Sequence, residues 1–211
     1  LFAINAGTGV VTFLASPDYE TPGDADTDND YQIRVRATDD GASPQSADQQ
    51  ITITVTDVND APTIGSDDAA DFAEGQVIAT TEIDVDATDA DVPPQNLTYS
   101  LVAGAGSADN ALFAINAGTG VVTFLASPDF ETPGDADTNN LYQIRVRAID
   151  DGAGTLSVDQ PITITVTGVN EAPTIGSGAT ANFVENQVIA TTAIDVDATD
   201  TDVPPQSLTY S

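Results

Sequence analysis

The chain has 211 residues, of which 34 are Asp or Glu and 4 are Lys or Arg, so its formal net charge at pH 7 is −30. It contains no His and no Cys, and its four basic residues are all Arg. These absences exclude a Ser-His-Asp or Cys-His nucleophile, an imidazole or thiolate metal site and a catalytic lysine. The negative charge argues against nucleic acid and anionic membranes as partners, and no apolar run is long enough for membrane insertion of this segment.

The sequence repeats itself with a period of 111 residues. Leu1–Asn5 recurs as Leu112–Asn116, and the match continues without gaps to the last residue, with roughly four in five overlapping positions identical. A period of this length fits a whole domain rather than one unit of a solenoid. The chain is therefore predicted to be part of a tandem domain array.

Two proline-ended segments are predicted to link these domains. Thr56–Pro62 and Thr167–Pro173 each follow a strand-like run and end in a residue that stops strand pairing. They divide the chain into the C-terminal part of one repeat (1–61), a complete repeat (62–172) and the N-terminal part of a third (173–211). We expect both chain ends to lie inside domains, with further residues preceding Leu1.

The complete repeat shows an alternation of apolar and polar residues with a period of two. Hydrophobic residues make up 40% of the chain, which is enough to bury a core. Strands are predicted, in chain order, at Phe72–Ala79, Ile83–Ala87, Leu97–Leu101, Phe113–Ile115, Val121–Leu125, Tyr142–Ala148 and Ile162–Val166. Seven short strands in about 110 residues, separated by Gly, Pro, Asn and Asp, are typical of an all-β sandwich.

All four arginines fall on one type of strand. Arg34 and Arg36, and their copies Arg145 and Arg147, are spaced two residues apart, so each pair shares one face of its strand. We predict that they face solvent and offset nearby carboxylates. A clamp for an anionic ligand is the alternative.

The acidic residues gather at strand ends and in loops, where the poles of the domains should lie. Groups occur at Asp18–Glu20, Asp57–Asp60, Asp89–Asp91 and Asp150–Gly152. Hard oxygen ligands at such spacing suit Ca²⁺, which takes about 6–8 oxygens. Without a cation, carboxylates this close together should repel one another.

These segments resemble a known family. Val85–Asp91 with Leu97–Leu101 resembles the opening half of a cadherin repeat, and Phe113–Thr123 resembles its middle. Asp129–Glu131 resembles its Asp-Arg-Glu motif, Val146–Gly152 its penultimate strand and turn, and Asp57–Pro62 its linker. The resemblance covers essentially the whole chain and is closest to the cadherin-like repeats of large bacterial surface proteins and adhesins. It implies tandem seven-stranded Greek-key β-sandwiches of the Ig-like or cadherin-like type, with a Ca²⁺ cluster at each domain junction.

The same resemblance implies which residues bind the metal. At the first junction they are Asp18, Glu20, Asp57, Asn59, Asp60, Asp89, Asp91 and Asp150. At the second they are Glu74, Asp129, Glu131, Asn170, Glu171, Asp200 and Asp202. Gly168 stands where the first linker has Asp57, so we predict fewer ions or weaker binding at the second junction.

A further acidic run imitates the start of an EF-hand loop. Asp24, Asp26 and Asp28 have the right spacing, but Asn29 replaces the required Gly and Val35 the bidentate Glu. The run is either a flexible acidic loop or an additional Ca²⁺ site.

The leading functional hypothesis is a non-enzymatic, extracellular or cell-surface repeat. In it, Ca²⁺ joins neighbouring repeats of one chain into a rigid rod, as part of a bacterial surface adhesin or an extracellular filament. The alternative is a module that binds surface glycans or other copies of itself. Trp is absent and Tyr is sparse, so the sequence offers a carbohydrate site little support.

Overall fold

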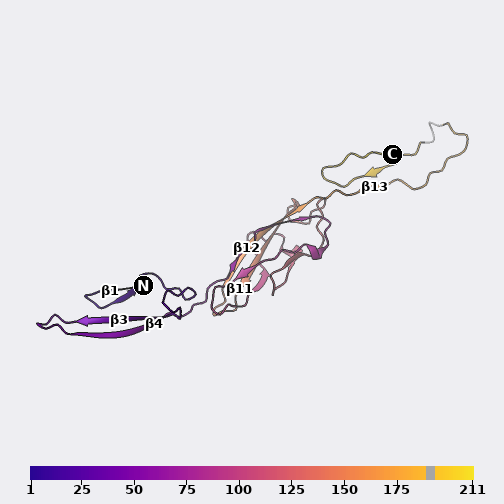
Figure 1. Ribbon diagram of the computed structural model, residues 1–211. Helices are drawn as coiled ribbons and strands as arrows, with labels where there is room; N and C mark the ends of the chain where they lie inside the picture. The colour runs from indigo at the N-terminus through magenta and orange to yellow at the C-terminus, as the bar shows by residue number, and fades with distance from the viewer. Residues whose placement is uncertain (189–192) are drawn as a thin grey trace. The chain divides into compact units, whose positions relative to one another are not determined.

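The computed structural model describes residues 1–188 and 193–211, so part of the predicted third repeat, residues 189–192, lies outside the described residues. The chain divides into two compact units, and Figure 1 shows its strands coloured by residue number. Unit 1 comprises Leu1–Pro62, Thr88–Leu97 and Ile149–Ser157, and unit 2 comprises Thr63–Ala87, Thr98–Ala148 and Val158–Ser211. Unit 1 thus combines the first part of the chain with two loops of the predicted complete repeat. The domain boundaries read from the sequence stay a prediction.

Unit 2 is built around a four-stranded sheet with the order β6-β12-β11-β8. These strands are β6 (Ala69–Ala73), β8 (Thr98–Leu101), β11 (Leu141–Ile149) and β12 (Ser157–Thr167). β6 runs parallel to β12, with Ala69 opposite Thr163. β9 (Phe113–Ile115) and β10 (Val122–Phe124) form a hairpin, and a bridge from Val122 connects this hairpin to Ile83. The hairpin belongs to the second layer of the predicted sandwich.

The predicted alternation builds the core of unit 2. Ile144 and Val146 on β11 and Ile164 on β12 are fully buried, whereas Arg145 and Arg147 point to the other face. Phe124 packs against Phe113 and against the edge of Tyr142, with ring centroids 4.3 Å and 5.2 Å apart. Other buried apolar side chains are Ile83, Val85, Tyr99, Val122, Ala148, Ile162 and Val166.

Two predicted strands differ in the structure. The strand predicted at Phe72–Ala79 lies at Ala69–Ala73 instead, because Gly75 takes a positive φ of 68° and the chain turns into a 3₁₀ turn, η1 (Ile78–Thr80). In Ile83–Ala87, Ile83 makes the only bridge and Ala87 belongs to the short β7 (Ala87–Thr88), which pairs with β5 (Thr63–Ile64). The alternating burial of Ile83–Ala87 is nonetheless as predicted.

Unit 1 repeats parts of the same pattern. β1 (Phe2–Ile4) pairs with β2 (Val11–Phe13) in the register that β9 has with β10, and β3 (Asp30–Thr38) pairs with β4 (Ser46–Thr54). The remaining elements are η2 (Asn110–Leu112), β13 (Thr174–Ile175) and β14 (Ala198–Thr199). Within residues 1–188 and 193–211, no helix has the length and apolar character that crossing a membrane requires.

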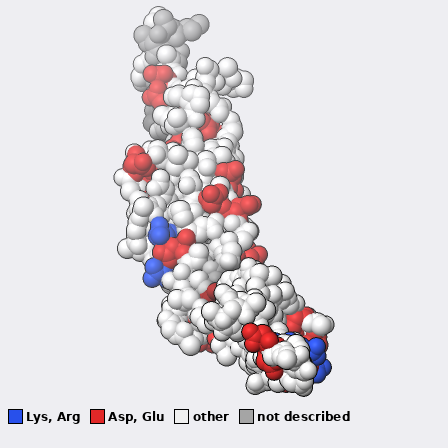
Figure 2. Space-filling view, turned by 90° about the vertical axis from the view of Figure 1, so that its left-hand side faces the viewer, with Lys and Arg blue, Asp and Glu red and all other residues white. Residues whose placement is uncertain are grey.

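Each arginine pair shares one aspartate on the neighbouring strand. Arg145 and Arg147 both bind Asp159, and Arg36 forms a two-pronged contact with Asp48. Figure 2 shows the basic side chains lying beside acidic ones on the molecular surface. The structure therefore supports charge compensation rather than a free anion clamp at these positions.

Candidate metal centres

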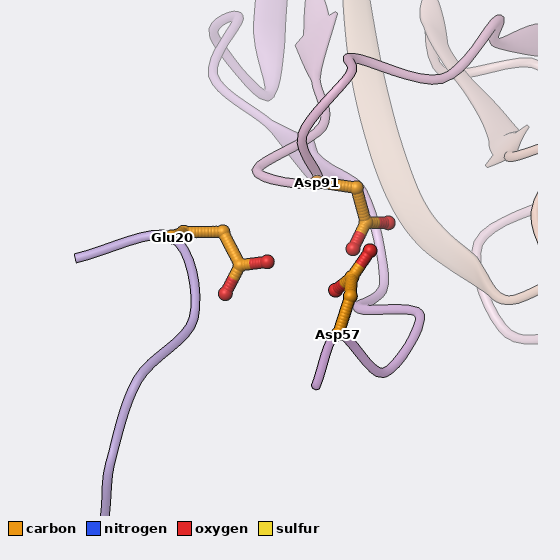
Figure 3. A group of neighbouring side chains, drawn as sticks. All are labelled: Glu20, Asp57 and Asp91. Atoms are coloured by element: carbon orange, nitrogen blue, oxygen red, sulfur yellow. The ribbon is translucent and has the colours of Figure 1, made fainter. Parts of the chain in front are cut away.

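Three carboxylates from separate segments converge in unit 1. Glu20 lies between β2 and β3, Asp57 follows β4, and Asp91 follows β7. Each offers an oxygen atom, and these atoms lie within 4.8 Å of one another. Figure 3 shows the carboxyl groups of Asp57 and Asp91 facing each other, with Glu20 pointing toward them. An open cleft of about 520 Å³ beside them is lined by Asp18, Glu20 and Asp60 among others.

Backbone amides fix the position of Asp91. Only 1% of its surface is exposed, and its two carboxylate oxygens accept the Asp60 N–H at 3.2 and 3.3 Å. The Asp91 N–H donates in turn to Asp89 Oδ1 at 3.0 Å. The predicted linker and the predicted Asp-x-Asp loop are thereby joined.

A second contact joins the linker to the loop after β11. Asn59 Nδ2 donates to Asp150 Oδ2 at 3.1 Å. Asp150 is buried and also accepts the backbone N–H groups of Gly152 and Leu156. Asp150 is thus held by its own loop with an oxygen turned toward the linker.

The charges in this group are poorly compensated. Burial, with added repulsion from Asp57, raises the pKa of Glu20, and burial with repulsion from Asp91 raises that of Asp89. Glu20 Oε1 and Asp89 Oδ2 are buried and accept no hydrogen bond. Buried acceptors without a donor are costly unless a cation satisfies them, and hard oxygens at this density fit Ca²⁺.

Unit 2 contains a corresponding group. Oxygens of Glu74, Glu131 and Glu171 lie within 4.8 Å of one another, beside a cleft of about 410 Å³. Glu74 is buried and accepts the backbone N–H groups of Val169 at 2.6 Å and Phe130 at 2.7 Å. Burial raises the pKa of Glu74, but these N–H groups outweigh it, so the pKa is lowered overall.

Glu171 is surrounded by other carboxylates. Burial, followed by repulsion from Asp202 and Glu74, raises its pKa to about 7. Its N–H donates to Asp202 Oδ1, and the Asp202 N–H donates to Asp200 Oδ1, as in the first group. Glu171 Oε2 and Asp202 Oδ2 are again buried acceptors without a donor.

Some other predicted ligands are exposed and already accept hydrogen bonds within the chain. Asp18 and Asp129 are exposed, and one oxygen of each accepts the N–H of the residue three positions later, Thr21 or Thr132. Asn170 is exposed and accepts a bond from Gln206. Ligation by the full predicted set stays a prediction.

Two glutamines belong to these sites although the sequence did not predict them. Gln95 Nε2 donates to both Asn59 and Asp91, and Gln206 Nε2 donates to Asn170. Their identity in both copies, beside the variable pair Asn96 and Ser207, was the available signal.

The EF-hand-like run forms a loop around its first carboxylate. Oxygens of Asp24, Asp26 and Asp28 lie within 4.8 Å of one another. Asp24 accepts the Asp28 N–H, and Asp135 in the second copy accepts two loop N–H groups. Asp24 Oδ1 is buried without a donor. Calcium binding by this loop stays a prediction.

Comparison with known proteins identifies relatives of this chain. No family model matches it. It is 32% identical over 176 residues to Protocadherin Fat 1 from Homo sapiens, covering 82% of this chain and 4% of that protein. It is 33% identical over 213 residues to the protocadherin-like wing polarity protein stan from Drosophila melanogaster, covering 96% of this chain and 6% of that protein. The domains of this chain are cadherin-like.

Solved structures agree on the fold. A crystal structure of human CDH23 EC21-23 matches with a TM-score of 0.61 and 22% identity, covering 95% of this chain and 61% of that one. The protocadherin gammaB7 EC3-6 cis-dimer structure matches with a TM-score of 0.55 and 23% identity, covering 86% and 46%. The all-β sandwich prediction is therefore confirmed. The comparisons support the cadherin-like part of the resemblance. The named relatives are metazoan, so they give no support to a bacterial source.

Proposed function

We propose that this cadherin-like chain is a non-enzymatic structural repeat whose junctions bind Ca²⁺. The observation that carries this proposal is the convergence of Glu20, Asp57 and Asp91 from three segments. In the same group, Glu20 Oε1 and Asp89 Oδ2 are buried and have no donor. Glu74, Glu131 and Glu171 support it with a second group of the same kind. Bound calcium would supply positive charge and coordination to these oxygens.

The residues themselves explain how such a junction would respond to the metal. Without it, the clustered carboxylates repel one another and raise the pKa values of Glu20 and Glu171. With it, the same ions are bound by the segment before the linker, the linker itself and the loops after it. The linker therefore loses freedom to hinge. We infer a rod segment that calcium rigidifies, built from repeats 1–61, 62–172 and 173–211.

The proposed setting is extracellular or at a cell surface. Calcium sites of extracellular modules have dissociation constants of about 0.1–1 mM, which cytosolic calcium would not fill. An adhesin stalk and an extracellular filament both need a stiff repeat of this kind. A bacterial origin remains our expectation from the sequence, without support from the relatives named above.

The test is a thermal melt of the full chain in calcium and in excess chelator. Binding to the native state alone stabilises it by about 2.7 kcal/mol at a calcium concentration 100 times Kd, so Tm should rise by several degrees. Asp57→Asn should reduce the rise, whereas Asp84→Asn, at an exposed acid outside both groups, should not. Equal melting temperatures in calcium and chelator would refute the proposal.

Self-association is a second candidate. The protocadherin gammaB7 structure with the same fold is described as a cis-dimer. Sedimentation of this chain over a range of concentrations, in calcium, tests it: a mass that stays at one chain rules it out.

A further inference from the structure

The side chain of Gln95 connects two segments of the first junction. Its Nε2 lies 2.6 Å from Asn59 Oδ1 in the linker and 2.6 Å from Asp91 Oδ2 in the loop after β7. Calcium–oxygen distances are about 2.3–2.6 Å. The distance from Gln95 Nε2 to each oxygen therefore falls within the range of a Ca²⁺–oxygen contact. A single uncharged donor thus takes the place of a cation between two candidate ligands.

The other end of the Gln95 carboxamide is unsatisfied. Oε1 is buried and accepts no hydrogen bond. The loop after β11 packs closely against the side chains of Gln95 and Asn59. A Cβ added at Gly152 would lie 2.1 Å from Gln95 Oε1 and 1.5 Å from Asn59 Oδ1. The two ends of a carboxamide have nearly the same size, so rotation by about 180° exchanges a donor for an oxygen ligand within this tight space.

The second junction repeats the arrangement in part. Gln206 Nε2 lies 2.5 Å from Asn170 Oδ1, and Asp202 Oδ2 is buried without a donor. Two junctions with different carboxylate sets therefore place the same amide on the same linker asparagine. This recurrence ties the glutamine to the junction rather than to one local packing arrangement.

We propose that Gln95 is an exchangeable substitute for the junction cation. In the cation-free chain its N–H groups hold the linker against the loop after β7. When Ca²⁺ binds Asn59 and Asp91, the carboxamide rotates and Oε1 becomes a ligand. The proposal deepens the proposed function and rests on it, because the exchange requires calcium at this junction.

Two substitutions separate the two roles. Gln95→Ala removes both the donor and the oxygen ligand, so it should loosen the cation-free junction and weaken calcium binding. Gln95→Glu also removes the donor and adds repulsion with Asp91, but it provides a charged oxygen. It should therefore loosen the cation-free junction and strengthen calcium binding. Gln49→Glu, at an exposed position of β4, is the control for added charge.

The experiment uses the full chain and two residue-resolved measurements. Hydrogen exchange in excess chelator follows the Asp60 N–H, which donates to Asp91. Calcium titration by NMR follows the Asp60 and Glu171 amides, which report the two junctions separately. In chelator, the Asp60 amide should exchange at least about fivefold faster in both Gln95 variants than in wild type and Gln49→Glu. At the first junction, Kd should rise at least about threefold in Gln95→Ala and fall in Gln95→Glu, with the second junction unchanged.

The outcomes distinguish this inference from the function on which it rests. Unchanged exchange of the Asp60 amide in Gln95→Ala would overturn the hydrogen-bonded substitute. Wild-type calcium affinity in Gln95→Ala would overturn the ligand exchange while calcium binding itself stands. A wild-type chain that takes up no calcium would refute the proposed function and the exchange together.

Discussion

At the scale of single residues, backbone amides hold the carboxylates of each junction in place. Asp91 is held by the Asp60 N–H, and Glu74 by those of Phe130 and Val169. Because the structure already positions these side chains, little ordering entropy would be lost if they bound the proposed cation.

Glycine at position 120 is required by both backbone conformation and space. Its φ is +77°, and a Cβ there would lie 2.3 Å from the Val85 carbonyl oxygen. We predict that Gly120→Ala lowers the free energy of unfolding by about 2–4 kcal/mol, from left-handed strain and a clash with backbone. Gly9→Ala is the matched control, because Gly9 has a φ of +72° but no neighbouring atom within 4 Å. Denaturant unfolding measures both, and equal losses would contradict the role of the clash.

The difference between the linkers at positions 57 and 168 predicts a reciprocal effect. Gly168→Asp should tighten calcium binding at the second junction by about tenfold, because affinity rises with the number of charged ligands. The new Cβ would lie 3.0 Å from the Phe130 ring, which must shift by a few tenths of an ångström. Asp57→Gly should weaken the first junction similarly.

Calcium titration followed at the Asp60 and Glu171 amides measures each junction. Gly178→Asp, at an open position, controls for added charge. Equal wild-type affinities at the two junctions would show that the carboxylate at position 57 contributes nothing.

At the scale of elements, paired strands determine the fold. In each of two strand pairs, one aspartate binds two arginines of the neighbouring strand, which favours the observed register. β11 and β12 bury their apolar residues in the core, and Asp159 on β12 accepts bonds from both arginines of β11. β3 and β4 repeat the arrangement around Asp48. The copies differ in solvent access: the Arg34 and Arg36 side chains are 74% and 65% exposed, against 25% and 40% for Arg145 and Arg147.

This difference predicts unequal costs for the two aspartates. Asp159→Asn should lower the stability of unit 2 by about 1 kcal/mol, whereas Asp48→Asn, with its more exposed partners, should cost less. The pKa of Asp159 is lowered from 3.8, chiefly by the hydrogen bond from Arg147. Its contribution is therefore present above about pH 4 and is lost as the pH falls through the lower native pKa. Denaturant unfolding from pH 7 to pH 2 should show wild type and Asp159→Asn converging in acid, and a constant difference would contradict this origin.

At the scale of the whole molecule, the net charge of −30 favours the attraction of cations to this chain. Each proposed junction contains a carboxylate group, and Glu20 and Glu131 occupy equivalent positions of the repeat in the two groups. An effect of calcium at one junction would therefore be expected to add up along a longer array.

This view predicts that chelation makes the chain more compact and more flexible. Small-angle scattering in calcium should give the larger radius of gyration, because joined junctions resist hinging while unjoined ones bend. K⁺ at matched ionic strength controls for screening, which weakens repulsion between exposed charges without coordinating carboxylates. Scattering curves that do not change on chelation would contradict a calcium-rigidified rod.

The sandwich, the repeat and much of each carboxylate group could be predicted from the residues alone. Alternating burial is local, so Ile144, Val146 and Ile164 could be assigned to the core from their period alone. Glu20, Asp57 and Asp91 were predicted because the resemblance aligns them with a junction, and the structure brings them together.

The side-chain hydrogen bonds of the junction become visible only in the folded chain. Gln95 and Asn59 are 36 residues apart in sequence, and no local pattern shows that two loops bring their side chains to 2.6 Å. Asp18 matched a motif, but one of its oxygens is taken up by the N–H of its own turn. Side-chain hydrogen bonds depend on which segments meet after folding, so they could not be read from residue spacing, whereas strand burial could.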